Sequence, residues 1–262
     1  MPASTPEDSL DVTKPSVPRM YDYALGGKDN FAADREAVDA IMRTAPEAMR
    51  HAVDNREFLR RAVQHVATQG VTQFIDIGCG LPTADNTHQI AKRANPLARV
   101  AYADNDHITV AHARALLATD TGTVAIEGDL SEPGTILGSP ELTSLIDFSQ
   151  PIAVVMVAVA HFLADPVAYD AVKHIKKAIP AGSYLVISHA TADDATQDEI
   201  ETIRSTYRAA RSPITMRTRD EVAQFFDGLD LVPPGVVSIS SWPAPPSTPG
   251  RTLSYGGVAR KP

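Results

Sequence analysis

The spacing of apolar positions along the chain changes near Gly70. Before it, apolar residues recur every three or four positions over residues 30–45 and 46–69, as in helices that bury one face. Pro46 separates the two predicted helices, and Asn30 is the expected N-cap of the first. After Gly70 short apolar runs predict strands over residues 73–77, 99–103, 123–127, 152–159 and 184–188.

Helical segments alternate with these strands. They are expected over residues 87–94, 108–118, 133–139, 167–178, 194–210 and 218–226. Two last strand-like runs, 231–240 and 252–259, are joined by a segment too rich in proline to form the helix that a parallel crossover usually needs. The pattern therefore predicts an α/β fold with a doubly wound, mostly parallel sheet of seven strands, the last of them antiparallel.

The same pattern suggests three parts of the chain. Residues 1–18 contain four prolines and no apolar periodicity, so we expect a mobile tail there. Residues 19–70 are expected to form a helical lid, because polar groups crowd around a pair of glycines near its start. Residues 71–262 then form the ligand-binding domain.

Composition narrows the classes of partner and the compartment. The 24 Lys and Arg against 32 Asp and Glu give a net charge of -8, which disfavours nucleic acid. The longest uncharged apolar run, residues 152–160, is far shorter than the roughly 20 residues that span a bilayer, so no membrane segment is expected. The amino terminus lacks the features of a secretory signal, so we expect a cytoplasmic protein. A single cysteine, Cys79, excludes an internal disulfide and a multi-cysteine metal site, and no metal is expected.

Two glycines, Gly78 and Gly80, follow the first predicted strand of the sheet. Missing side chains let the backbone approach a ligand at such a turn. Thr83 stands where a dinucleotide fingerprint has a third small residue, and Pro82 has no amide hydrogen for a phosphate. The loop is therefore either a cradle for a nucleotide-like ligand or a plain tight turn.

Acidic residues accompany the first three predicted strands. Asp76 lies in the first, Asp104 ends the second, and Asp129 follows the third, so all three should meet at one rim of the sheet. Asp104 is placed to accept hydrogen bonds from ribose hydroxyls; the alternative is a helix cap, for which Asp106 is the better candidate. An acidic rim favours a cationic nucleoside over a pyrophosphate, and S-adenosylmethionine combines a sulfonium with one adenosine.

Several motifs carry a resemblance to a known family. They are Tyr21-Asp22-Tyr23-Ala24-Leu25-Gly26-Gly27-Lys28-Asp29-Asn30-Phe31, Asp34-Arg35, Asn55-Arg56, Phe74-Ile75-Asp76-Ile77-Gly78, Leu81-Pro82-Thr83, Asp104-Asn105-Asp106, His161-Phe162 and Ser188-His189-Ala190-Thr191. With them the chain resembles, over nearly all of its length after the tail, a bacterial family of class I S-adenosylmethionine-dependent methyltransferases long catalogued as a domain of unknown function. The resemblance implies a Rossmann-like, seven-stranded methyltransferase sheet with an antiparallel last strand.

The resemblance also implies how the cofactor S-adenosyl-L-methionine is held. In it Asp76, Gly78 and Gly80 frame the methionine part, Asp104 holds the ribose, and Asp129 meets the adenine. The complete set of expected cofactor-binding residues is Asp76, Gly78, Gly80, Asp104, Asn105, Asp129, Leu130, Tyr23 and Arg56. Arg56 is a candidate partner for the cofactor carboxylate, because arginine binds carboxylates through two parallel hydrogen bonds.

Candidates for the chemistry itself are fewer. His161 follows the fourth strand and His189 the fifth, so either is a candidate general base, although each is as easily a packed histidine. Tyr21 in the amino-terminal segment is the third candidate catalytic residue. Methyl transfer is an in-line displacement in which positioning supplies much of the acceleration, so neither a metal nor a covalent nucleophile is needed.

The leading hypothesis is therefore a methyltransferase that acts on a small-molecule acceptor. A nucleotide-dependent oxidoreductase using NAD would share the same strand-helix-strand unit. A non-catalytic protein that only binds S-adenosylmethionine is the third possibility, because no single residue stands out as the base. Both a monomer and a homodimer are open.

Overall fold

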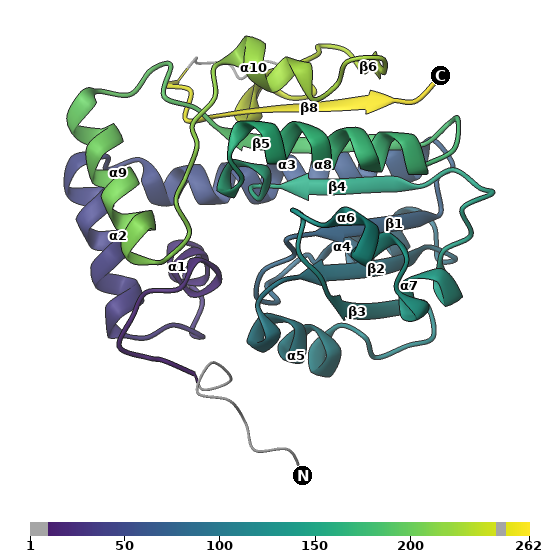
Figure 1. The fold of residues 1–262 in the computed structure, drawn as a ribbon, viewed down its shortest axis with the longest axis horizontal. Helices are drawn as coiled ribbons and strands as arrows, with labels where there is room; N and C mark the ends of the chain where they lie inside the picture. The colour runs from purple at the N-terminus through teal and green to yellow at the C-terminus, as the bar shows by residue number, and fades with distance from the viewer. Residues whose placement is uncertain (1–9, 245–249) are drawn as a thin grey trace.

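The structure, a computed structural model, describes residues 10–244 and 250–262 (Figure 1). Its centre is one sheet with strand order β3-β2-β1-β4-β5-β8-β6, and β7 also pairs with β8. The strands are β1 (Gln73–Ile77), β2 (Arg99–Asp104), β3 (Thr123–Glu127), β4 (Ala153–Val157), β5 (Tyr184–Ala190), β6 (Asp230–Leu231), β7 (Val237–Ser238) and β8 (Ser254–Arg260). Strands β1 to β5 are parallel, and β8 runs antiparallel to β5. The predicted fold class is confirmed.

Prolines explain two differences from the predicted elements. The strand expected over 231–240 is divided into β6 and β7, because Pro233 and Pro234 between them cannot donate to the ladder. The helix expected over 133–139 is α6 (Pro133–Leu137), and a further helix, α7 (Pro140–Leu145), follows it. Sequence reasoning missed α7, although its start has a Ser139 side chain that caps Leu142 and a proline at the first position.

Helices cover both faces of the sheet. α3 (Ala48–Thr68), α4 (Thr87–Ala94) and α5 (His107–Leu116) pack on one face, and α8 (Asp165–Ala178) and α10 (Arg219–Gln224) pack on the other with α6 and α7 (Figure 1). Alternate residues of β1 point to opposite faces, so Phe74 joins one core and Ile75 the other. Because α3 shares a buried core with β1, β2 and β4, this helix belongs to the layers of the sheet, although its residues lie within the expected lid.

Three other helices form a separate small core beside the carboxyl ends of the parallel strands. They are α1 (Val17–Ala24), α2 (Ala32–Thr44) and α9 (Gln197–Ala209), and we call them the cap (Figure 1). Met20 of α1 and Val38 and Ile41 of α2 are buried against Ile203 and Tyr207 of α9. The amino-terminal helices α1 and α2 therefore pack with α9, which begins about 180 residues after α1, beside the same edge of the sheet.

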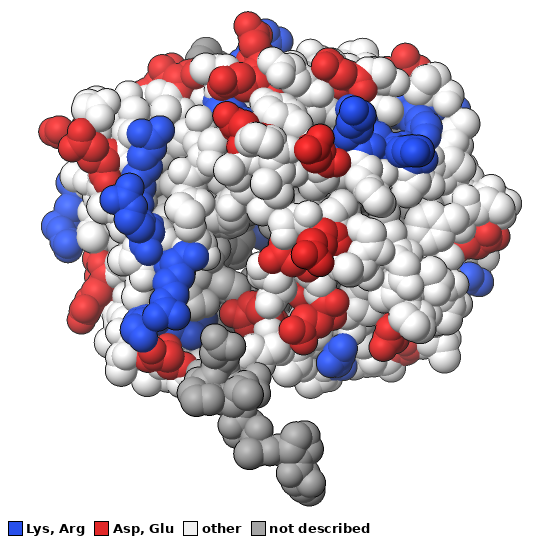
Figure 2. All heavy atoms as spheres, viewed as in Figure 1, with Lys and Arg blue, Asp and Glu red and all other residues white. Residues whose placement is uncertain are grey.

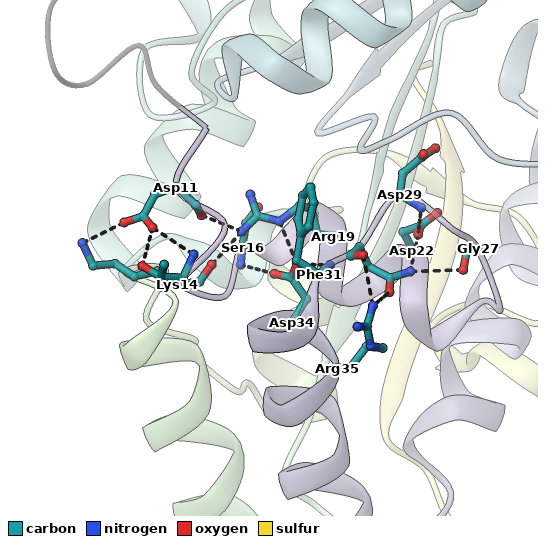
Figure 3. Close-up of polar contacts among 12 residues, drawn as sticks. Asp11, Lys14, Ser16, Arg19, Asp22, Gly27, Asp29, Phe31, Asp34 and Arg35 are labelled. Atoms are coloured by element: carbon teal, nitrogen blue, oxygen red, sulfur yellow. Dashed lines mark hydrogen bonds and ion pairs between the residues drawn. The ribbon is translucent and has the colours of Figure 1, made fainter.

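The tail expected over residues 1–18 is shorter than predicted in the part that the structure describes. Helix α1 begins at Val17, and Arg19 donates to the backbone oxygens of Lys14 at 2.6 Å and Asp11 at 3.2 Å (Figure 3). The guanidinium of Arg19 also pairs with the buried carboxylate of Asp34 at 2.8 Å. The chain from Asp11 onward is therefore fastened to the cap, whereas residues 1–9 of the expected tail lie outside the described residues.

Asn30 is not the N-cap of the following helix. That position is held by Phe31, whose backbone N–H donates to the Asp34 carboxylate at 2.8 Å. The Asn30 amide instead donates to the Asp22 carboxylate at 2.8 Å and to the Gly27 carbonyl at 3.1 Å. The prediction failed because the preceding loop offered Asn30 a buried acceptor, which sequence spacing does not show.

The proline-rich segment near the carboxyl end begins inside the core. Trp242 is only 1% exposed and packs edge-on against Phe58 and His65 of α3. The Arg61 guanidinium of the same helix donates to the Trp242 carbonyl at 2.6 Å. Trp242 therefore fastens the start of the β7–β8 connection to the sheet layer, and residues 245–249 of that connection lie outside the described residues.

Candidate functional site

A cavity of about 590 Å³ lies between the carboxyl ends of β1 to β5 and the cap. Figure 2 shows a hollow on this face, with acidic side chains on one side and a row of basic side chains on the other. Most of the predicted cofactor residues line it, namely Asp76, Gly78, Gly80, Asp104, Asn105, Asp129, Leu130 and Arg56. The structure thus brings together residues from β1, from β2, from the loops that follow β1 to β3, and from α3.

The two glycines of the glycine loop have similar backbone angles but different surroundings. Gly78 has φ +74°, and a Cβ there would overlap the Val159 side chain, so both the backbone angle and the space require glycine. Gly80 has φ +64°, but nothing lies within 4 Å of where its Cβ would be. The loop therefore packs tightly at Gly78 and is open at Gly80, where a ligand can approach the backbone.

Asp104 and Asp106 have different partners, and the capping role expected of Asp106 is confirmed. Asp104 accepts from the Gly80 N–H at 2.9 Å and from the Asp106 N–H at 3.0 Å, so its carboxylate fastens the glycine loop to the end of β2. Burial raises its pKa, against the effect of these backbone hydrogen bonds. Asp106 caps α5 by accepting from the N–H groups of Ile108 and Thr109 at 2.8 and 2.9 Å.

The other two rim acids differ in electrostatic state. Asp76 is buried in β1 and accepts from the Thr87 hydroxyl at 2.6 Å; burial raises its pKa to about 6. Burial alone would raise the pKa of Asp129. Hydrogen bonds from the Asn105 amide at 2.9 Å and the Ser131 N–H at 2.7 Å outweigh this effect, so the pKa of Asp129 is lowered. The rim therefore holds one carboxylate that is costly to ionise and one that ionises readily.

The two expected cofactor residues from the amino-terminal helices lie in different places. Arg56 lines the cavity, and its guanidinium donates to the carbonyls of Ala84 at 3.1 Å and Asp85 at 3.0 Å, across the glycine loop. The Tyr23 side chain is not among those lining the cavity, and its hydroxyl donates to Asp39 of α2 at 3.2 Å. The structure therefore gives Tyr23 a contact within the cap.

Tyr21 lines the cavity but is committed to a buried hydrogen-bond chain. Its hydroxyl donates to the Ala52 carbonyl at 3.2 Å and accepts from the Asn55 amide at 2.9 Å. The Asn55 carbonyl in turn accepts from the Ser188 hydroxyl at 2.6 Å, which joins the cap to β5. Burial raises the pKa of Tyr21, so the phenol stays protonated at neutral pH. Asn55 and Ser188 each belong to a motif that carries the family resemblance, but only the fold shows that their side chains are hydrogen-bonded to each other.

The two candidate histidines lie side by side, and only one faces the cavity. His161, in the turn η2 (Ala160–Phe162), lines it, and the ring of His189 lies 5.6 Å away centre to centre. His189 is fully buried, and the Arg217 guanidinium contacts its Nε2 at 2.6 Å. Burial lowers the pKa of His189 to about 3 and that of His161 well below its usual range. The structure does not bring His189 to the site.

A third histidine, His51 of α3, was missed by sequence reasoning. It lines the cavity, and its Nε2 lies 3.1 Å from the Ser254 hydroxyl of β8. Burial lowers its pKa to about 4. No local sequence signal marks it, since its neighbours in the helix are ordinary helix formers and its partner is 203 residues away.

Within residues 10–244 and 250–262 no helix is both long and apolar enough to cross a membrane. In the same ranges no three His, Cys, Asp or Glu residues gather as metal ligands would.

Sequence comparison decides between the families that this geometry allows. Residues 3–262 match the S-adenosyl methyltransferase family. The chain belongs to that family. No curated protein matches it significantly.

Solved relatives of this methyltransferase family agree with the assignment. A DUF574 family protein from Streptomyces avermitilis is 39% identical with a TM-score of 0.91, over 97% of this chain and 100% of that chain. A protein from Thermobifida fusca described as a candidate methyltransferase is 36% identical with a TM-score of 0.89, over 99% of each chain. An O-methyltransferase family protein from Burkholderia thailandensis, at 14% identity and a TM-score of 0.51 over 84% of this chain and 61% of that chain, shares the fold alone.

Proposed function

We propose that this family member transfers a methyl group from S-adenosylmethionine to a small molecule bound beneath the cap. One observation carries the proposal. Asp76 of β1, Asp104 at the end of β2 and Asp129 after β3 come from three adjacent strands and line a single cavity with the open glycine loop. Cofactors bind in this crevice, beyond the carboxyl ends of the strands, in open α/β sheets.

The residues present fit the cofactor. Nothing occupies the space beside Gly80 where a Cβ would point, so a ligand can lie against the backbone there. Each oxygen of the Asp104 carboxylate accepts one backbone hydrogen bond and has a further lone pair for a ribose hydroxyl. A buried carboxylate at Asp76 is stabilised by a nearby cation, which the ammonium and sulfonium of S-adenosylmethionine provide.

The chain's own groups would bind and orient the reactants. When bound, S-adenosylmethionine supplies the methyl carbon, to which an acceptor lone pair bonds as the carbon–sulfur bond breaks and S-adenosylhomocysteine remains. The rim would hold the cofactor, and the cap would exclude water and set the acceptor in line, since such alignment supplies much of the acceleration. A small acceptor is favoured because the cavity is partly covered by the cap and totals only about 590 Å³.

Calorimetry tests the proposal first. The full chain is titrated with S-adenosylhomocysteine, S-adenosylmethionine and NAD. We expect the two methionine derivatives to bind and NAD to bind more weakly. Absence of heat with millimolar S-adenosylhomocysteine, or tighter binding of NAD, would overturn the proposal.

Turnover is tested separately. The protein is incubated with labelled S-adenosylmethionine and a bacterial metabolite extract, and we expect label in a product of low molecular mass. Cofactor binding with no labelled product from varied extracts would instead support a non-catalytic binding protein.

A further inference from the structure

The cap side of the cavity is mainly apolar. Met20, Ile41 and Ile203 of the cap helices line it. Phe162, also in the lining, packs against Tyr207 of α9. Two charged side chains also lie on this side. The Glu199 carboxylate is paired with Arg251 at 2.8 Å, and Arg211 is exposed at the surface. An acceptor held here would contact apolar surface and the few neutral polar groups that remain.

Arg217 fixes the protonation of His189. An arginine side chain stays charged and can only donate, so the Arg217 guanidinium donates to Nε2 of His189 at 2.6 Å. The remaining proton of the neutral His189 ring must then be on Nδ1, which lies 2.8 Å from the Ala190 carbonyl oxygen. The two contacts agree on one tautomer. Arg217 itself is held over the Tyr169 and Phe225 rings and is only 1% exposed, so this arrangement is rigid.

The neighbouring backbone selects the opposite tautomer for His161. The Ala190 N–H donates to Nδ1 of His161 at 3.3 Å, so this nitrogen is an acceptor. Burial, together with the charge of Arg217, keeps the pKa of His161 well below its usual range, so the ring is uncharged at neutral pH. Its single proton is therefore on Nε2.

His161 lines the cavity, and its second ring nitrogen is Nε2. None of the described residues forms a hydrogen bond with it. In the same part of the chain, the buried side-chain polar atoms without a partner are Thr109 Oγ1 and Trp242 Nε1, so His161 Nε2 is in contact with accessible space. The cavity wall thus presents the Nε2–H group of His161 as a hydrogen-bond donor beside the apolar ring of Phe162.

We propose that the cap side of the cavity takes an apolar, ring-sized acceptor that offers a hydrogen-bond-accepting oxygen or ring nitrogen to His161 Nε2–H. The proposal rests on the proposed function. His161 is then a donor that orients the acceptor, and the general-base role expected from the sequence does not fit its tautomer. The methylated atom is a separate atom, whose lone pair faces the cofactor.

Matched fragments test the proposal without turnover. The protein saturated with S-adenosylhomocysteine is titrated with quinoline, naphthalene and indole, followed by ligand-observed NMR. Quinoline carries an accepting nitrogen, naphthalene has no polar atom, and indole can only donate. We expect quinoline to bind about threefold to tenfold more tightly than the other two, the range of one neutral hydrogen bond.

Two variants connect the preference to His161. His161→Leu should bind all three fragments equally, whereas His161→Gln, which keeps an N–H donor, should retain part of the preference. Both should bind S-adenosylhomocysteine as the unmodified protein does, which also shows that they fold. Nitrogen NMR of the histidine rings at pH 7 should find His161 protonated at Nε2.

Three results would overturn the proposal: no fragment binding, equal binding of the three fragments to the unmodified protein, or a proton on His161 Nδ1. Loss of S-adenosylhomocysteine binding by the unmodified protein would instead remove the proposed function on which it rests. The two failures are therefore distinguishable.

Discussion

Acidic side chains at the rim and in the cap lie within one molecule but do different work. At the rim, Asp76 and Asp104 line the cavity while accepting hydrogen bonds from neighbouring groups. In the cap, Asp22 and Asp34 are 4% and 0% exposed, and their carboxylates accept from the backbone and side chains of the same segment (Figure 3). The rim acids line the cavity in which we propose that the cofactor binds, whereas the cap acids hold the cap segment together. A dense polar motif alone therefore does not indicate chemistry.

Removing Asp34 should give the largest effect and separate the two regions. Its carboxylate holds Arg19 and the N–H groups of Ser16 and Phe31. Breaking such a buried pair from one side costs about 3 to 5 kcal/mol, so we expect Asp34→Ala to lower the free energy of unfolding by that amount in chemical denaturation. The exposed Asp29 side chain provides the control, and Asp29→Ala should be near neutral. Equal stability of the two variants would contradict the structural role of Asp34.

At the rim, the paired variants Asp104→Ala and Asp106→Ala should affect different properties. Asp104→Ala is expected to weaken S-adenosylhomocysteine binding by about 1 to 3 kcal/mol in calorimetry, because the ribose and the glycine loop lose their acceptor. Asp106→Ala removes the cap of α5 and should cost about 1 kcal/mol of stability with little change in affinity. Affinity that responds to Asp106 and not to Asp104 would show that the ribose site is misplaced.

Acid should weaken cofactor binding through Asp76. Its pKa of about 6 means that the carboxyl is mostly protonated at pH 5 and mostly ionised at pH 7.5. A cationic ammonium beside it favours the ionised form, so affinity for S-adenosylhomocysteine should rise about tenfold between these pH values and then level off. The charged neighbours that act on Asp76 are Arg56, which lowers its pKa, and Asp104, which raises it. Calorimetry on Asp76→Asn should show a flatter profile, and an unchanged profile would exclude Asp76 as the cause.

The smallest effect is expected at Tyr23, in the cap. Its hydroxyl contacts Asp39 outside the set of cavity-lining residues, so Tyr23→Phe should leave S-adenosylhomocysteine affinity within about twofold. A calorimetric loss of tenfold or more would return Tyr23 to the cofactor site expected from the sequence.

Sequence periodicity predicted the sheet well because its determinants are local. The limits of β1 and β3 agree with the expected strands, and the proline-rich connection predicted the antiparallel β8. Short-range prolines also explain what was missed, since Pro140 starts a helix that the apolar pattern alone does not distinguish. Local patterns therefore locate the helices and strands, and the rules of chain connection are needed to arrange the strands in the sheet.

Of the residues that line the cavity, only those at the strand ends could be grouped from the sequence. Acids at the ends of successive parallel strands must share an edge, so Asp76, Asp104 and Asp129 could be grouped from spacing alone. The cap side depends on contacts between distant segments, such as His51 with Ser254, and no periodicity encodes them. Likewise, the difference between His161 and His189 depends on Arg217, an arginine with no distinguishing neighbours in sequence.

A crystal structure with S-adenosylhomocysteine bound tests the division of the cavity most directly. The ribose hydroxyls should lie within hydrogen-bond distance of Asp104, with the adenine beside Leu130 and the sulfur turned toward the space between His161 and the cap. A ligand bound elsewhere, or one whose adenine lies beneath the cap, would contradict the assignment of the rim to the cofactor and the cap to the acceptor.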